Sequence, residues 1–115
     1  MPLSKNARSN HAPYLAVNSA VSSAGTTLAT ATDLTADLSV LSTVTTTQGV
    51  SLDDMEIGDS QEIYNNTVTE CLVYPPTTSD LINQLAAGAA MVLPGYTSVI
   101  LRRVTATRFV AYLSG

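Results

Sequence analysis

The residues able to carry nucleophilic or zinc chemistry are few in this chain and far apart in its sequence. There is one cysteine, Cys71, and one histidine, His11, which precedes Pro13 in a polar N-terminal stretch. A thiolate–imidazole pair needs both side chains within hydrogen-bond reach, and a structural zinc site needs about four such ligands. Nothing in the sequence brings His11 to Cys71. We therefore expect no catalytic residue, no metal site and no cofactor, and a protein that is not an enzyme.

A cluster of carboxylates is the other candidate for ion chemistry. Loop 53–59, which reads DDMEIGD, carries the acids Asp53, Asp54, Glu56 and Asp59. Hard cations such as Ca²⁺ prefer clustered oxygen ligands. This stretch lacks the full alternation of an EF-hand loop and its terminal bidentate glutamate. A solvated acidic loop or a patch that faces a partner fits the residues better than a calcium site.

Charge is distributed unevenly along the chain, whose formal net charge is -4. Every acid lies between Asp33 and Asp80, whereas the basic residues lie near the ends: Lys5, Arg8, Arg102, Arg103 and Arg108. Complementary potentials of this kind orient copies of a subunit, and an acidic surface also keeps a protein soluble. Five basic residues on an acidic chain do not form the clustered footprint of a nucleic-acid binder. We also expect no membrane span, since no apolar run is long enough.

Arg102 and Arg103 are adjacent in a strand-like run, so their side chains face opposite sides. One of them then points towards a core or an interface, where an arginine must be paired. We expect that one to meet an acidic loop residue of a neighbouring subunit. The alternative is that both lie near the strand end and extend into water.

The composition and periodicity predict an all-β fold. The runs 97–105 and 107–113 are rich in β-branched and aromatic residues that alternate in polarity, and we expect them to be adjacent antiparallel strands. Further strands are expected at 38–46, 50–52, 60–64, 69–74 and 89–93, separated by turn signals such as Asn65-Asn66-Thr67. Segment 77–90 is read as a loop, with a short helix as the alternative. Such spacing favours a small antiparallel β-sandwich or jelly-roll-like domain.

The chain divides by composition into an extended N-terminal arm, 1–25, and a β-sandwich domain, 26–115. The arm is rich in Ala and Ser and shows little periodicity, so ordering it needs contacts with other chains or with a sheet edge of its own domain. The residues we expect to make capsid or subunit contacts are the two arginines 102 and 103 and, in the arm, Lys5, Arg8, Tyr14 and Leu15.

Several short motifs, in this order, resemble a small β-domain of tailed-bacteriophage virion structural proteins. They are Ile63-Tyr64-Asn65-Asn66-Thr67, then Leu72-Val73-Tyr74-Pro75-Pro76, then 82–90 (INQLAAGAA) and the ending 104–111 (VTATRFVA). The resemblance covers roughly residues 25–115. Phe109 stands where that pattern more usually has a tryptophan, and loop 51–60 is more acidic than the pattern.

This resemblance implies a virion component. We expect a capsid decoration or cement protein on the capsid surface, assembled in the host cytoplasm, with the major capsid protein and its own copies, as a homotrimer, as partners. The alternative is an adaptor on a tail or head fibre, or a module that binds the host surface through carbohydrate. Tyr64, Tyr74, Tyr96 and Tyr112 are the aromatic residues expected to stack on sugars in that case.

Overall fold

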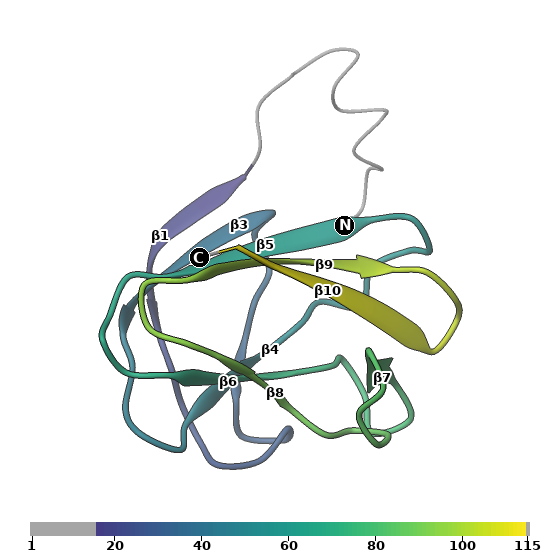
Figure 1. Cartoon of the computed structure of the whole chain (residues 1–115), viewed down its shortest axis with the longest axis horizontal. Helices are drawn as coiled ribbons and strands as arrows, with labels where there is room; N and C mark the ends of the chain where they lie inside the picture. The colour runs from purple at the N-terminus through teal and green to yellow at the C-terminus, as the bar shows by residue number, and fades with distance from the viewer. Residues whose placement is uncertain (1–15, 115) are drawn as a thin grey trace.

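The computed structural model describes residues 16–114 and shows an all-β protein (Figure 1). Ten strands and no helix occur in this range, so neither a helix in segment 77–90 nor a membrane-spanning helix is found there. The strands are β1 (Val17–Ser22), β2 (Thr32–Asp33), β3 (Leu38–Thr43), β4 (Gly49–Ser51), β5 (Ser60–Asn65), β6 (Cys71–Tyr74), β7 (Leu81–Ile82), β8 (Met91–Leu93), β9 (Ser98–Arg103) and β10 (Arg108–Ser114).

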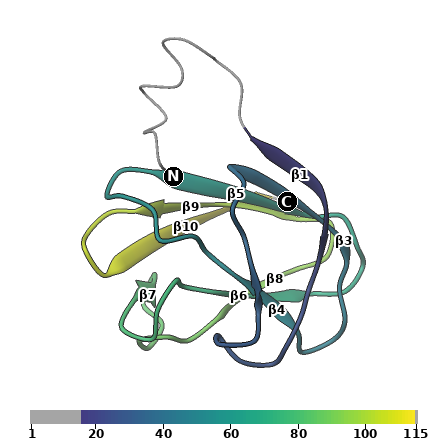
Figure 2. The same cartoon turned by 180° about the vertical axis from the view of Figure 1, so that it is seen from behind.

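The chain passes back and forth between two sheets. Sheet A has the order β1-β3-β5-β9-β10-β7 and sheet B the order β2-β4-β6-β8, so strands β1 to β8 alternate between them (Figure 2). Five of the eight strand pairings are parallel, including β1 with β3 and β3 with β5. The expectation of an antiparallel domain is therefore wrong for most pairings. The winding is solenoid-like and is not clearly that of a sandwich or a jelly roll.

The antiparallel pair at the C-terminus is confirmed. β9 and β10 pair from Phe109 opposite Arg103 to Ser114 opposite Ser98, and β9 also pairs antiparallel with β5. Val99, Leu101 and Phe109 are fully buried. The period-2 pattern of these runs thus places alternate side chains in the core, as it does in any half-buried strand.

The N-terminal boundary of the sheet lies earlier than composition suggests. Residues 17–22, which the sequence places in the arm, form β1 and pair with β3. Most of β1 is exposed, and Val21 alone of its residues is buried. Backbone pairing with β3 therefore holds this strand, and such pairing leaves little periodicity in the side chains. Residues 1–15 lie outside the described part, so an arm there stays a prediction.

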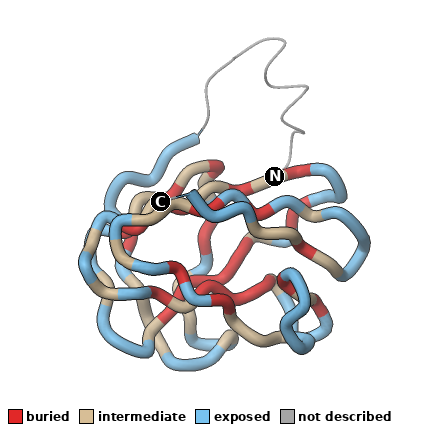
Figure 3. Tube along the Cα trace, viewed as in Figure 1, coloured by how far each residue is buried: buried red, intermediate tan, exposed pale blue. Residues whose placement is uncertain are grey.

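One hydrophobic core lies between the two sheets (Figure 3). Sheet A contributes side chains such as Leu41, Ile63 and Phe109, and sheet B contributes Val50 and Val73. All five are fully buried. Burying an aliphatic or aromatic side chain stabilises a fold by about 1.5–3 kcal/mol relative to exposing it. The shared core makes the described chain one packed unit.

Two buried amides on β5 connect the core to the loops. Gln61 donates to the carbonyl oxygens of Leu34 and Ala36 and accepts from the backbone N–H of Asp53 at 2.8 Å. Buried amides are tolerated when their donors and acceptors are satisfied. Gln61 therefore fixes the start of loop 53–59 against the segment before β3.

Asn65 connects the core to the loops at the C-terminal end of β5. Its Nδ2 donates to the carbonyl oxygens of Thr69, Leu93 and Pro94, the first at 2.8 Å. Its Oδ1 accepts from the backbone N–H and the hydroxyl of Thr67. The predicted turn at Asn65-Asn66-Thr67 thus forms, and this one side chain joins it to the end of β8.

Candidate interaction surface

The outer face of sheet A carries several apolar side chains, and no described element covers it. Strand register places one residue from each of five strands in a central row across it: Val17, Leu38, Glu62, Ile100 and Tyr112. Val17 and Tyr112 are each 55% exposed and Ile100 is 38% exposed. Val40, Tyr64 and Val110 lie in the rows on either side, which register also sets. The face therefore carries exposed apolar side chains on both sides of Glu62, and Leu38, Val40, Tyr64 and Val110 are half-buried.

Two opposite charges lie on the same face. Glu62 of β5 is paired in register with Ile100, and Arg102 of β9 is paired with Ser60, so the two charged residues are diagonal neighbours. Diagonal neighbours in a sheet are about 7–8 Å apart. Arg102 turns to the carbonyl oxygen of Gly58, to which its Nη1 donates at 2.9 Å. Within residues 16–114 the carboxylate of Glu62 has no hydrogen bond or ion pair.

Arg103 points the other way, to the core side of the sheet, and meets the acidic loop of its own chain. Its Nη1 lies 2.8 Å from Oδ1 of Asp54 and also donates to the carbonyl oxygen of Met55. Its Nη2 donates to the carbonyl oxygen of Ala106 and lies 4.0 Å from Oδ1 of Asp80. The sequence-based expectation placed the acidic partner in a neighbouring subunit, and that contact stays a prediction. The acidic partner seen here belongs to the same chain, because loop 53–59 lies beside the end of β9 and is hydrogen-bonded to it.

The acidic side chains of loop 53–59 do not gather into one cluster in the structure. Among the described residues, no group of three or more His, Cys, Asp or Glu side chains lies close enough to hold a metal ion. Asp54 is turned to Arg103, and Asp59 is buried, with its Oδ2 unpartnered. The loop is therefore held to the sheet by arginine contacts.

Cys71 is buried in the core on β6. Burial raises the pKa of its thiol to about 11, an effect that a hydrogen bond from the backbone of Val50 partly opposes. A nucleophilic cysteine needs a lowered pKa and access to solvent. Cys71 thus behaves as a small core residue. His11 lies outside the described residues.

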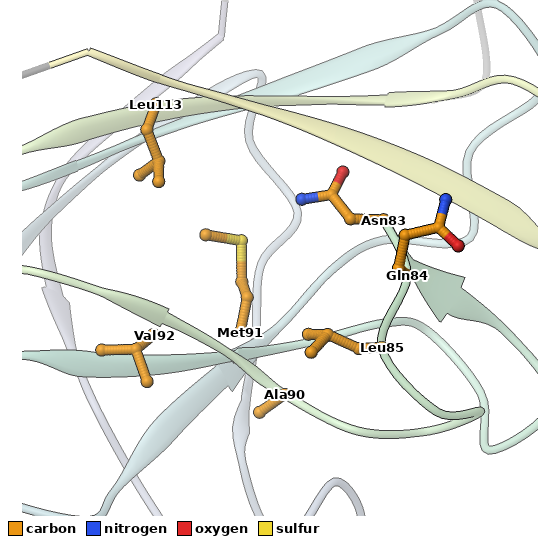
Figure 4. A pocket seen from close by; sticks show the side chains of 7 residues that line it. All are labelled: Asn83, Gln84, Leu85, Ala90, Met91, Val92 and Leu113. Carbon is orange, nitrogen blue, oxygen red and sulfur yellow. The ribbon is translucent and has the colours of Figure 1, made fainter.

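An open groove lies where the two sheets end. Its volume is about 450 Å³, and its lining residues are Asn83, Gln84, Leu85, Ala90, Met91, Val92 and Leu113. Figure 4 shows Leu113 of β10 and Met91 of β8 pointing towards each other across it. Leu113 is exposed, and the edge strand β7 pairs with β10 only at its start, at Arg108 and Phe109. Sequence reasoning missed this groove, since it depends on how far each sheet extends.

The residues predicted to contact the capsid or other subunits lie partly outside and partly inside the described range. Lys5, Arg8, Tyr14 and Leu15 lie outside the described residues, so their contacts remain predictions. Arg102 is on the outer face of sheet A and exposed, whereas Arg103 is mostly engaged inside the chain. The sequence analysis missed the central row, although the alternation in β5 and β9 marks its members. Comparison with known protein families, with curated proteins and with solved structures finds no match to this chain.

Proposed function

We propose that this protein is a non-enzymatic virion structural protein that binds and stabilises a capsid as a decoration or cement protein. The motif resemblance over residues 25–115 supports the virion assignment. The observation that carries an assembly role is the uncovered apolar face of sheet A, with Ile100 and Tyr112 exposed on it. Apolar side chains exposed on an uncovered sheet face are a kind of surface through which proteins bind partners.

The proposed mechanism is stabilisation by selective binding. A protein that binds only the assembled lattice shifts the equilibrium towards that lattice by mass action. The N-terminal residues, Lys5, Arg8, Tyr14 and Leu15, are the proposed contacts with the major capsid protein. The apolar face of sheet A is left for a second partner. The resemblance implies self-association as a homotrimer, and the spacing of the short strands favours a sandwich arrangement of the two sheets.

The test is the number of copies in purified particles, measured by quantitative mass spectrometry against the major capsid protein. A decoration protein should be present at a ratio close to that of the capsid protein. A few copies for each particle would replace this proposal by an adaptor at the neck, the tail or a fibre. Absence from the particles would overturn the virion assignment altogether.

A second function is favoured by the groove beside β10. The groove combines the amides of Asn83 and Gln84 with the apolar Leu85 and Leu113, a mixture of polar and apolar groups that is typical of small-ligand sites. The groove has no aromatic lining residue, and Tyr74 is buried with its hydroxyl donating to the carbonyl oxygen of Thr26. A host-surface carbohydrate module is therefore the weaker proposal. Specific sugar binding on a glycan array, lost in Leu113→Asp, would favour it.

A further inference from the structure

We propose that the outer face of sheet A binds a second copy of this chain, face to face, around a two-fold axis that passes between Glu62 and Arg102. The dimer rests on the proposed function, because it assigns a partner to the face that carries the proposed assembly role. The dimer is tested on the purified chain without capsids, so its absence would leave the capsid role standing.

The two charged residues on this face indicate that its partner is a second copy of the chain. Glu62 is unpaired among the described residues, and the exposed Arg102 uses one guanidinium nitrogen to donate a hydrogen bond to the carbonyl oxygen of Gly58. A two-fold contact is self-complementary, since residue i meets residue j and j meets i. An axis between these two residues places each Glu62 opposite the other copy's Arg102. The dimer thus contains two Glu62–Arg102 pairs, which the two-fold axis relates to each other.

The apolar residues of the central row fit the same arrangement. Ile100 lies on β9, directly beside Glu62 of β5, and Tyr112 of β10 follows in the same row. Near the axis, Ile100 of one copy packs close to Ile100 of the other, and the aromatic rings lie further out. The central charge pairs would fix the register of the two copies, and the apolar side chains around them would exclude water from these pairs.

The size of the face predicts the strength of the contact. The face is five strands wide, at about 4.8 Å for each strand, and about five residues long, at about 3.3 Å for each residue. Its area is therefore roughly 400 Å². A standard interface buries about 800 Å² on each partner. The dimer should therefore be weak, with a dissociation constant of roughly micromolar order or higher. Many copies held on one shell would make such a weak contact effective.

The experiment is sedimentation equilibrium of the purified full chain from about 1 μM to 1 mM, a range that brackets the expected constant. The mass should rise with concentration from that of one chain, 12.0 kDa, to twice that value. A monomer at every concentration would overturn the proposal, for instance if the chain's own residues 1–15 cover the face. A trimer, which the sequence resemblance implies, would also overturn it.

Charge reversal tests the geometry. Glu62→Arg and Arg102→Glu should each weaken the dimer about tenfold or more, because each places like charges opposite each other. The double variant Glu62→Arg/Arg102→Glu should recover an affinity within about threefold of the original, since both pairs are restored. Circular dichroism and thermal melting establish that each variant is folded.

Glu70→Arg is the matched control, because Glu70 is an exposed acid outside the strands of sheet A. It should leave the dimer unchanged. A dimer that is insensitive to Glu62→Arg and Arg102→Glu would place the interface elsewhere. A double variant that is weaker than either single variant would rule out the reciprocal pairing.

Discussion

Arg103 and Phe109 face each other across β9 and β10, and the guanidinium carbon of Arg103 lies 5.3 Å from the centroid of the Phe109 ring. A cation at this distance over an aromatic face is attracted by the ring. The same guanidinium also bonds to Asp54 and to the backbone of Met55 and Ala106. One side chain therefore ties the acidic loop and the β9–β10 turn to the edge of the core.

The first prediction is that Arg103→Met destabilises the fold by about 1–3 kcal/mol, since the carbonyl oxygens of Met55 and Ala106 lose their donor. Methionine keeps most of the apolar stem, so lost packing contributes little. Urea denaturation followed by circular dichroism measures the change. Arg102→Met is the control, because that side chain is exposed, and it should change stability by less than about 0.5 kcal/mol. Equal effects of both variants would contradict this role for Arg103.

The second prediction concerns the buried amide of Asn65. Asn65→Ala should destabilise the protein by about 2 kcal/mol or more, because the carbonyl oxygens of Thr69 and Leu93 and the N–H of Thr67 lose their partner. The neighbouring exposed Asn66 is a matched control, and Asn66→Ala should be nearly neutral. Chemical denaturation measures the free energy of unfolding of both variants. Equal losses in Asn65→Ala and Asn66→Ala would show that the hydrogen bonds of Asn65 do not stabilise the fold.

The third prediction is that Cys71 is unreactive in the folded state. Burial raises the pKa of its thiol from 9.0 to about 11, so little thiolate is present near neutral pH. A thiol reagent at about pH 8 should modify Cys71 only as fast as the chain unfolds, and at once in denaturant. Rapid modification of the native protein would contradict the buried position.

The fourth prediction is the pH dependence that the same thiol implies. The folded state holds this proton more tightly than the unfolded state, whose thiol has the ordinary pKa of 9.0. The contribution to stability is fully present below about pH 9 and is lost as the pH rises towards about 11. The wild type should therefore lose more stability over this interval than Cys71→Ala does. Parallel losses in the two proteins would count against the raised pKa.

The fifth prediction concerns the close approach of Gly95 to the turn after β5. A Cβ atom at Gly95 would lie 2.5 Å from the carbonyl oxygen of Val68 and 2.7 Å from that of Thr67. Gly95→Ala must move this backbone and should cost about 1–3 kcal/mol. Gly58→Ala is the comparison variant. A Cβ atom at Gly58 would meet nothing within 4 Å, but φ there is +95°, so this variant has backbone strain without a steric clash. Thermal melting should rank Gly95→Ala as the more damaging variant.

The local elements of this protein can be recognised from neighbouring residues in the chain. Alternation of β-branched and aromatic residues located β9 and β10 and their antiparallel pairing, because a half-buried strand must repeat every two residues. Turn residues such as Asn65 and Asn66 marked where strands end, and adjacency in a strand put Arg102 and Arg103 on opposite sides. These are properties of neighbouring residues, so they can be seen in the sequence.

The pairing of the strands, and the candidate surface that this pairing creates, depend on contacts between segments distant in the sequence. The parallel pairing of β1 with β3 and of β3 with β5 joins segments about 20 residues apart through backbone groups that every residue carries. Together with the antiparallel pairing of β5 with β9 and of β9 with β10, it sets the row from Val17 to Tyr112. The position of loop 53–59 beside β9 gives Arg103 its partner in the same chain. Contacts between distant segments depend on register and on the extent of each sheet, and a local pattern fixes neither.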